Sequence, residues 1–244
     1  METQATYQKS SKVDSSDCRL EWLVLSQRPL LKAYLGDCMD LMASTADNYY
    51  DLAIVDPPYG IGASDYQRGG TQYGNSVAKC KTYTTKDWDK EIPSLKYFTE
   101  LRRVSKNQII WGGNYFELYP TPCFVVWDKD NGNNGYADCE LAWTSFKTAV
   151  RKFTWKWQGM LQQNMADKEH RIHPTQKPVA LYRWLLQNYA KAGQRILDTH
   201  GGSFSSAVAC HMEGFEMDIC EIDKEYFDAG VKRFKENTCQ LKMF

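Results

Sequence analysis

The order of apolar and polar positions predicts short strands that alternate with helices. Short apolar runs bounded by turn residues indicate buried strands, whereas apolar positions three and four apart indicate helices. By these signals the chain has strands at 30–35, 51–55, 108–111, 123–127, 139–146, 151–157, 195–198 and 215–220, and helices at 38–46, 94–104, 115–119, 179–190, a stretch ending near Gly214, and 225–237. This alternation predicts an α/β fold with a mostly parallel sheet. The strands between 123 and 157 have no helices between them, so we expect an antiparallel addition.

A glycine turn near the C-terminal end indicates a nucleotide site. Gly201 and Gly202 follow the strand ending at Asp198, and Glu221 ends the next strand about 20 residues later. In nucleotide-binding α/β folds the turn amides approach the ligand and such a carboxylate binds the ribose hydroxyls. A plain structural turn is the alternative, but the two acidic strand ends favour a ligand. Too few residues follow Asp198 to complete a doubly wound sheet, so we expect a circularly permuted one.

The second candidate site is Asp56-Pro57-Pro58-Tyr59, which follows the buried strand 51–55. An exocyclic aromatic amine is a poor nucleophile because its lone pair is delocalised into the ring. Two acceptors aimed at the amino hydrogens would draw that pair back: the Asp56 carboxylate and the Pro57 carbonyl, held by the stiff Pro-Pro backbone. Tyr59 offers a ring on which an extruded base could stack. A proline-stiffened turn without catalysis is the alternative interpretation.

Composition changes this picture little. The 244 residues are 43% hydrophobic and carry a formal net charge of zero, which is unusual for a protein that binds nucleic acid. Between Lys147 and Arg195, however, ten basic residues accompany two acidic ones. That segment indicates either phosphate binding or a solvated basic face. The N-terminal residues are polar and no apolar run is long enough to span a membrane, so we expect a cytoplasmic protein.

Cysteines and histidines give no sign of a metal site. The eight cysteines are scattered without a C-x-x-C pair and several lie in apolar runs, which indicates buried free thiols. The histidines at 170, 173, 200 and 211 lack the spacing of a structural zinc site. We therefore expect no metal.

Taken together, the motifs resemble those of the amino-group DNA methyltransferases, in the β-class order that places Asp-Pro-Pro-Tyr before the cofactor motif. The resemblance runs from about Leu31 to Phe234. It rests on Gly36-Asp37-Cys38, Asp56-Pro57-Pro58-Tyr59-Gly60, Trp111-Gly112-Gly113-Asn114-Tyr115-Phe116, His173-Pro174-Thr175-Gln176-Lys177-Pro178, Asp198-Thr199-His200-Gly201-Gly202-Ser203 and Glu221-Ile222-Asp223.

The resemblance implies a Rossmann-like class I methyltransferase fold, S-adenosylmethionine as cofactor, and N6 of adenine in double-stranded DNA as the leading substrate. Asp56 favours adenine over N4 of cytosine, because cytosine-specific relatives more often carry serine there. A homodimer and a role in restriction–modification would fit. The implied catalytic residues are Asp56, Pro57, Pro58 and Tyr59, and the implied cofactor-binding residues are Asp37, Cys38, Lys177, Pro178, Asp198, His200, Gly201, Gly202, Ser203 and Glu221, with Lys177 and Pro178 at the methionine end.

The expected organisation is a flexible N-terminal tail followed by a single methyltransferase domain. The predicted ranges are a tail at 1–25, a domain at 26–244 with a catalytic half at 26–172 and a cofactor half at 173–244, a mobile loop at 60–92, and a candidate target-recognition segment at 129–171. In that last segment, Trp155 and Trp157 indicate either base contact or core packing.

The chain departs from the resemblance at two places. It has Phe204 where the family usually has glycine, and Thr199-His200 where it often has Pro-Phe. A side chain at a glycine position can block a positive φ angle or crowd a ligand. Two alternatives therefore stay open: an enzyme acting on N4 of cytosine, on RNA or on a free amide, and a degenerate methyltransferase fold that binds DNA or a partner without catalysis.

Overall fold

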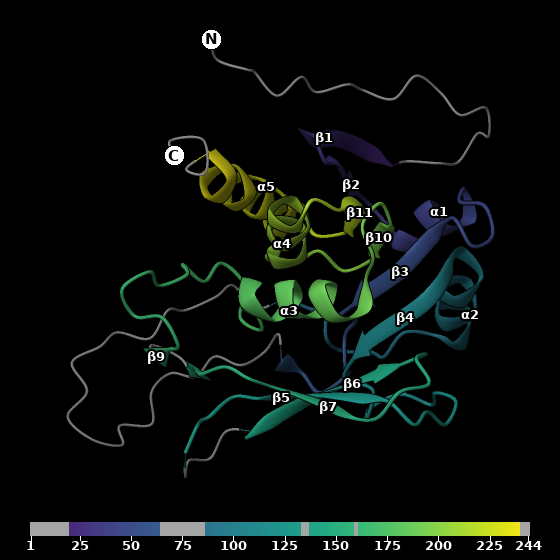
Figure 1. Cartoon of the computed structure of the whole chain (residues 1–244). Coiled ribbons are helices and arrows are strands. Elements are labelled where there is room, and N and C mark those ends of the chain that lie inside the picture. Colours follow the sequence, from purple (N-terminus) through teal and green to yellow (C-terminus); the bar gives the residue numbers. More distant parts are fainter. Residues whose placement is uncertain (1–19, 64–85, 133–136, 159–160, 240–244) are drawn as a thin grey trace.

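One twisted sheet organises the computed structural model, which describes residues 20–63, 86–132, 137–158 and 161–239 (Figure 1). Its nine strands lie in the order β1-β2-β11-β10-β3-β4-β6-β5-β7. Their bounds are β1 Glu21–Gln27, β2 Leu30–Leu35, β3 Tyr50–Val55, β4 Ser105–Trp111, β5 Phe124–Asp128, β6 Cys139–Thr144, β7 Arg151–Thr154, β10 Arg195–Asp198 and β11 Glu216–Glu221, and a separate ribbon pairs β8 Trp157–Gln158 with β9 Leu161–Gln162. The helices are α1 Cys38–Ala43, α2 Leu95–Val104, α3 Val179–Tyr189, α4 Ser205–Glu213 and α5 Lys224–Cys239.

The strand order confirms the predicted permutation. The last two strands along the chain, β10 and β11, lie in the interior of the sheet between β2 and β3. All four run parallel, since β11 pairs in parallel with β2 and with β10, and β10 pairs in parallel with β3. The two ends of the chain thus build one continuous parallel core.

Helices cover both faces of this sheet, as alternation along β3 requires. Leu52 and Ile54 point into one apolar core with residues of α3, α4 and α5, whereas Ala53 and Val55 point into the other with residues of α1 and α2. Successive side chains of a strand point to opposite faces, so a strand buried on both sides is apolar throughout. Figure 1 shows α3, α4 and α5 on one side of the sheet and α1 and α2 on the other.

The antiparallel addition is smaller than predicted. β6 runs antiparallel to both β4 and β5, which confirms the antiparallel addition, but β7 pairs with β5 in parallel and departs from that expectation. β6 and β7 lie on opposite sides of β5. The chain between them therefore passes β5 and reverses its direction, so that β7 runs parallel to β5.

A second antiparallel strand was not predicted and shortens the expected tail. Glu21–Gln27 forms β1, which pairs antiparallel with β2 at the edge of the sheet, so the predicted tail at 1–25 is wrong from Glu21 onward. Burial of Leu23, which is 5% exposed, anchors this hairpin in the core. Residues 1–19 lie outside the described part of the chain.

Other local predictions had mixed outcomes. The predicted helix at 115–119 does not form, because the segment is a turn begun at Gly112 and followed closely by Pro120 and Pro122. Most of the predicted loop at 60–92, residues 64–85, lies outside the described residues. The core-packing interpretation of Trp157 is confirmed, since it is 6% exposed and its indole Nε1 donates to the Gln176 carbonyl. Across the described ranges, no helix combines the length and apolar character needed to cross a membrane.

Thiols are buried at three of the described positions and exposed at one. Cys123, Cys210 and Cys220 are buried and free, as predicted. Cys139, the first residue of β6, is free but exposed, so the prediction of burial is wrong there.

Candidate active site

The two predicted carboxylates lie at the same edge of the sheet. β3 and β10 are adjacent and parallel, with Leu52 opposite Ile196 and Ala53 opposite Leu197. Asp198 is the last residue of β10 and Asp56 directly follows β3, so both lie at the carboxyl ends of their strands. Ligands of open α/β sheets bind at this edge. The geometry on which a shared crevice depends is therefore present.

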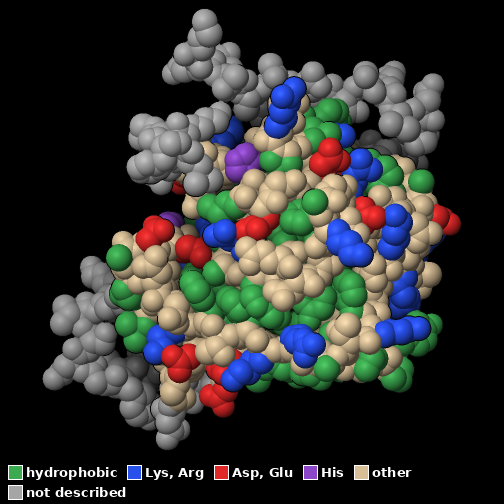
Figure 2. Space-filling view, in the orientation of Figure 1, with side chains coloured by type: hydrophobic (Ala, Val, Ile, Leu, Met, Phe, Trp, Pro, Cys, Tyr) green, Lys and Arg blue, Asp and Glu red, His purple; other side chains and the backbone are tan. Residues whose placement is uncertain are grey.

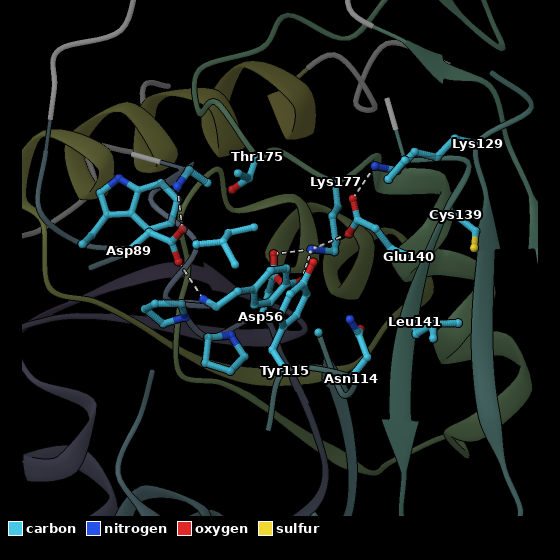
Figure 3. Close-up of a pocket in the computed structure, with 18 residues that line it drawn as sticks. Asp56, Asp89, Asn114, Tyr115, Lys129, Cys139, Glu140, Leu141, Thr175 and Lys177 are labelled. Carbon is cyan, nitrogen blue, oxygen red and sulfur yellow. Dashed lines mark hydrogen bonds and ion pairs between the residues drawn. The ribbon is translucent and has the colours of Figure 1, made fainter. Parts of the chain in front are cut away.

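Asp56 lies in a cavity of about 310 Å³ (Figure 3). Its Oδ1 accepts a 2.5 Å hydrogen bond from the Tyr59 hydroxyl, and its Oδ2 forms an ion pair with Lys177 Nζ. Burial raises the pKa of Asp56, while the Lys177 ammonium opposes the shift. The cavity is lined by Asp56, Pro57, Pro58, Tyr59, Ile61, Ala63, Trp88, Asp89, Gly112, Asn114, Tyr115, Lys129, Ala137, Cys139, Glu140, Leu141, Thr175 and Lys177. All four predicted catalytic residues thus reach one cavity.

Tyr59 is held between a glycine and a second aromatic ring. Its ring stacks on Tyr115, with centroids 5.0 Å apart and planes 14° from parallel. A Cβ atom at Gly112 would come within 2.2 Å of the Tyr59 ring, and Gly112 also has a φ of 71°. Only glycine satisfies both conditions at that position. The cavity therefore has a planar aromatic wall suited to stacking with a flat ring.

Asp89 fixes the backbone of the loop 59–63, which follows the Asp-Pro-Pro motif. Its side chain, 1% exposed, accepts hydrogen bonds from the amides of Tyr59 at 2.6 Å, Gly60 at 3.0 Å and Ala63 at 2.7 Å. Three amides on one carboxylate form a strong charge-assisted cluster. Asp89 could not be identified from the sequence, because nothing in its local sequence distinguishes it from a surface carboxylate.

A chain of alternating charges extends from Asp56 across the cavity. Lys177 Nζ lies 3.2 Å from Glu140 Oε2, and Glu140 Oε1 lies 2.5 Å from Lys129 Nζ. Burial alone would raise the pKa of Glu140, but Lys177 and Lys129 outweigh it and lower that pKa to about 2. Burial tends to lower the pKa of Lys177, but Asp56 and Glu140 raise it. The four groups therefore form three ion pairs in series, and the Lys177 side chain at their centre is 3% exposed.

Asp198 is the buried carboxylate of the cofactor half. Its Oδ1 accepts from the His200 amide at 3.0 Å and its Oδ2 from the Ser206 hydroxyl at 2.6 Å. Burial raises its pKa to about 7, and the carboxylates of Asp56 and Glu221 add to the shift. Burial also lowers the pKa of the His200 imidazole to about 4, so that ring is neutral at pH 7.

Glu221 links the glycine turn to the end of β11. Its Oε2 accepts from the Gly202 amide at 2.7 Å and its Oε1 from the Asp223 amide at 2.8 Å. Asp37, the N-cap of α1, lies close by, because the amide of Gly36 donates to the Glu221 carbonyl at 3.0 Å. The predicted residues Asp37, Cys38, Asp198, His200, Gly201, Gly202 and Glu221 thus meet at the ends of β2, β10 and β11.

The donor set fits the cofactor that the resemblance implies. Asp198 and Glu221 are 1% and 7% exposed, and burial raises the pKa of both carboxyls. Buried carboxylates require compensating cations or hydrogen-bond donors. A ligand that carries ammonium and sulfonium charges and ribose hydroxyls supplies both, so the residues present suit S-adenosylmethionine.

Phe204 does not crowd this crevice. Its backbone adopts the left-handed conformation, with φ 58° and ψ 25°, and its side chain is fully buried. The ring packs beneath the turn, where a Cβ at Gly230 would come within 2.4 Å of it and a Cβ at Gly201 within 2.8 Å. Phe204 therefore adopts the positive φ angle that a glycine would have at this position, and its ring is packed inside the core.

Three further residues that the resemblance assigns to the cofactor, Lys177, Pro178 and Ser203, have surroundings that differ from those of the group at the ends of β2, β10 and β11. Lys177 points into the Asp56 cavity, as described above. Pro178 is the N-cap residue of α3. The Ser203 hydroxyl lies 3.0 Å from that of Ser205 within the protein.

Carboxylates from outside the basic segment offset part of its charge. Besides the pairs of Lys177 described above, its ion pairs with such carboxylates include Lys152 with Asp128, Lys156 with Asp130, Arg183 with Glu213 and Arg195 with Glu216. On the face in Figure 2, basic and acidic side chains are interspersed. The segment is therefore not a uniformly basic surface.

Comparison with known proteins agrees with this geometry. A family model described as DNA methylase, N6_N4_Mtase, matches residues 129–232. The Escherichia coli (strain K12) protein named "Putative methylase YubD" is 25% identical over 217 residues, which cover 81% of this chain and 87% of that protein. The type II methyltransferase M2.MboI of Moraxella bovis is 22% identical over 250 residues, which cover 86% of this chain and 89% of that protein.

Solved structures share the fold. The M1.HpyAVI–SAM complex superposes with a TM-score of 0.52 at 20% identity, covering 83% of this chain and 99% of that one. The cytosine-N4-specific PvuII DNA methyltransferase superposes with a TM-score of 0.51 at 14% identity, covering 86% and 90%. The fold is therefore that of the class I methyltransferases. In its C-terminal part this chain is therefore similar to the N6/N4 DNA methylase family, and over most of its length it is similar to proteins named as methylases.

Proposed function

We propose that this protein transfers a methyl group from S-adenosylmethionine to N6 of an adenine rotated out of double-stranded DNA. The observation that carries the proposal is the position of Asp56 and Asp198 at the carboxyl ends of adjacent parallel strands. One carboxylate lies in a cavity with an aromatic wall, and the other lies beside a glycine turn. A flat base and a nucleoside cofactor could approach each other from these two sides.

The residues of the cavity would activate the target amine. Asp56 and the Pro57 carbonyl are acceptors for its two hydrogens, which localises the lone pair on nitrogen and stabilises the positive charge that develops there. Tyr59 and Tyr115 supply the ring surface for stacking. A base inside a duplex cannot enter such a cavity, so the target nucleotide must leave the stack.

The cofactor half would bind the methyl donor. Glu221 would accept hydrogen bonds from the ribose hydroxyls, and Asp198 would face the cationic end of the ligand. Asp37, Cys38, His200, Gly201 and Gly202, which lie at the ends of β2 and β10, would form the remaining wall of this region. S-adenosylmethionine, when bound, supplies an electrophilic sulfonium methyl group.

N4 of cytosine is the second candidate substrate. The PvuII enzyme, whose name describes it as cytosine-N4-specific, shares this fold with a TM-score of 0.51. Both bases present an exocyclic amine beside a ring nitrogen, so the acceptor pair at Asp56 and Pro57 would serve either. The aspartate that begins the motif favours adenine through the resemblance described above.

A methyl-transfer assay tests the proposal. The protein is incubated with labelled S-adenosylmethionine and duplex DNA, single-stranded DNA, RNA or a protein mixture, and digested nucleosides are identified by mass spectrometry. We expect N6-methyladenine from duplex DNA. N4-methylcytosine would support the second candidate, and label in RNA or protein alone would overturn the proposal.

A pair of matched variants tests the site within that assay. Asp56→Asn preserves shape but removes the charge, and we expect at least about a hundredfold loss of kcat, in line with the loss of one preorganised electrostatic group. Asp51→Asn changes a carboxylate of β3 that pairs with Lys106 on the surface, and should leave kcat unchanged. Calorimetry with S-adenosylmethionine on the Asp56 variant should show binding close to that of the parent protein. Absence of cofactor binding in the parent protein would support a degenerate fold instead.

A further inference from the structure

The buried ion chain Asp56–Lys177–Glu140–Lys129 includes two residues to which the proposed chemistry gives no part. Glu140 lies on β6 and Lys129 directly follows β5, whereas Asp56 follows β3 and Lys177 precedes α3. Four separate segments therefore bring alternating charges together at one cavity. In Figure 3 the Lys177 side chain lies between the carboxylates of Asp56 and Glu140, and Lys129 reaches Glu140 from the far side.

Lys177 creates a problem for a catalytic carboxylate. Its side chain is 3% exposed, so water screens its charge weakly. An ammonium paired with Asp56 alone would neutralise the negative charge that the developing cation on the amine requires. Glu140 changes this balance because its Oε2 lies 3.2 Å from the same ammonium.

We infer that Glu140 is a positioning residue for methyl transfer, which divides the Lys177 charge between two carboxylates so that Asp56 stays an effective acceptor for the target amine. This inference rests on the proposed function. Lys129, 2.5 Å from Glu140 Oε1 and 5.1 Å above the Trp127 ring, limits how strongly Glu140 competes for Lys177. Removing Glu140 and removing Lys129 should therefore shift the properties of Asp56 in opposite directions.

The pH dependence of Asp56 provides the discriminating readout. The groups that act on or face it are Lys177, Glu140, Tyr59, Asp198, Tyr97 and Tyr182. The Glu140 charge raises the pKa of Asp56 and the Lys177 charge lowers it. Asp56 is active when ionised, so a lower pKa moves the acid limb of the kcat profile to lower pH. Glu140→Gln should move that limb down, and Lys129→Met should move it up.

The experiment compares both variants with the parent protein on duplex DNA. For Glu140→Gln we expect kcat at the plateau to fall about tenfold, less than for a group that contacts the substrate directly. Glu140→Asp should recover part of this loss, and the Kd for S-adenosylmethionine should change less than about twofold in each variant, well under the 1.4 kcal/mol of a tenfold change. Glu213→Gln is the matched control, because it removes a glutamate paired at 2.6 Å with Arg183 away from the cavity.

A second measurement keeps the inference testable apart from activity. The Asp56 carboxyl is titrated by carbon-13 NMR in the parent protein and in both variants, with thermal melts to confirm folding. We expect the Asp56 pKa to fall in Glu140→Gln and to rise in Lys129→Met. Unchanged Asp56 titration, or a kcat loss in Glu140→Gln that is equal at every pH, would overturn the inference. No methyl transfer by the parent protein together with the expected NMR shifts would instead count against the proposed function.

Discussion

The Tyr59 hydroxyl donates a 2.5 Å hydrogen bond to Asp56 Oδ1, three residues earlier in the chain. The first and last residues of the Asp-Pro-Pro-Tyr motif are therefore hydrogen-bonded to each other, and one tyrosine both orients the carboxylate and offers its ring to the cavity. The same hydroxyl lies 3.2 Å from Lys177 Nζ. Because the ring and the hydroxyl have separate tasks, two substitutions can distinguish them.

Tyr59→Phe removes the hydroxyl and keeps the ring, whereas Tyr59→Ala removes both. We expect kcat/KM on duplex DNA to fall less than about tenfold for Phe and by about tenfold to a hundredfold for Ala, since base stacking on an aromatic residue contributes about 1–3 kcal/mol. The comparison uses steady-state kinetics with thermal melts as the folding control. Equal losses in the two variants would show that the hydroxyl, and not the ring, carries the effect.

The parallel core was predictable because its signals are local. Leu52 to Val55 are apolar on both faces, which is the mark of a strand covered on two sides. The partner of an edge strand depends on distant segments instead. The parallel pairing of β7 with β5 follows from the path between β6 and β7, which no local pattern encodes. The hairpin β1–β2 was missed for a similar reason, since the apolar run 22–25 follows a long polar stretch and its pairing with β2 is not visible in the local pattern.

The site was predictable where chemistry and motif coincide, and not elsewhere. Asp56, Tyr59 and Asp198 follow apolar strands, so their place at one edge could be inferred from the sequence. Glu140 and Lys129 come from β6 and the end of β5, and only the antiparallel pairing of those strands brings them to the cavity. The resemblance assigned Lys177 to the cofactor, whereas its contact with Asp56 depends on the packing of α3 against the sheet and could not be predicted from the motif.

Asp89 should be essential for the order of the loop 59–63. Asp89→Ala leaves the amides of Tyr59, Gly60 and Ala63 without their acceptor, and hydrogen bonds to a charged group contribute about 1.5–3 kcal/mol each. We expect a lower melting temperature and a fall in kcat with little change in cofactor affinity. Asp87→Ala is the control, because that side chain is 76% exposed and pairs with Lys90 on the surface. A wild-type melting temperature for Asp89→Ala would contradict the expectation.

Cofactor binding should depend on pH through Asp198. Its pKa is raised to about 7, so the carboxyl is mostly protonated at pH 6 and mostly ionised at pH 8. A cationic ligand prefers the ionised form, so affinity for S-adenosylmethionine should increase about tenfold from pH 6 to pH 8. The His200 pKa of about 4 and the His173 pKa of about 3 keep both rings neutral over this range. Calorimetry at several pH values measures the effect, and Asp198→Asn should flatten the profile. A slope that persists in that variant would assign the titration to another group.

Phe204 and Gly230 should be energetically coupled, because the phenylalanine ring fills the space that a side chain at Gly230 would need. In an unhindered helix, Gly→Ala stabilises by about 1 kcal/mol. At Gly230 the new Cβ would lie 2.4 Å from the Phe204 ring, so we expect Gly230→Ala to destabilise by about 1–3 kcal/mol through overpacking. Phe204→Leu alone should also destabilise the protein, since it leaves part of the core unfilled. The double variant should be more stable than the sum of the single effects predicts, because the smaller side chain makes room for the Cβ. Urea unfolding of the four proteins measures this coupling, and additive effects would show that the ring and the helix do not compete for the same space.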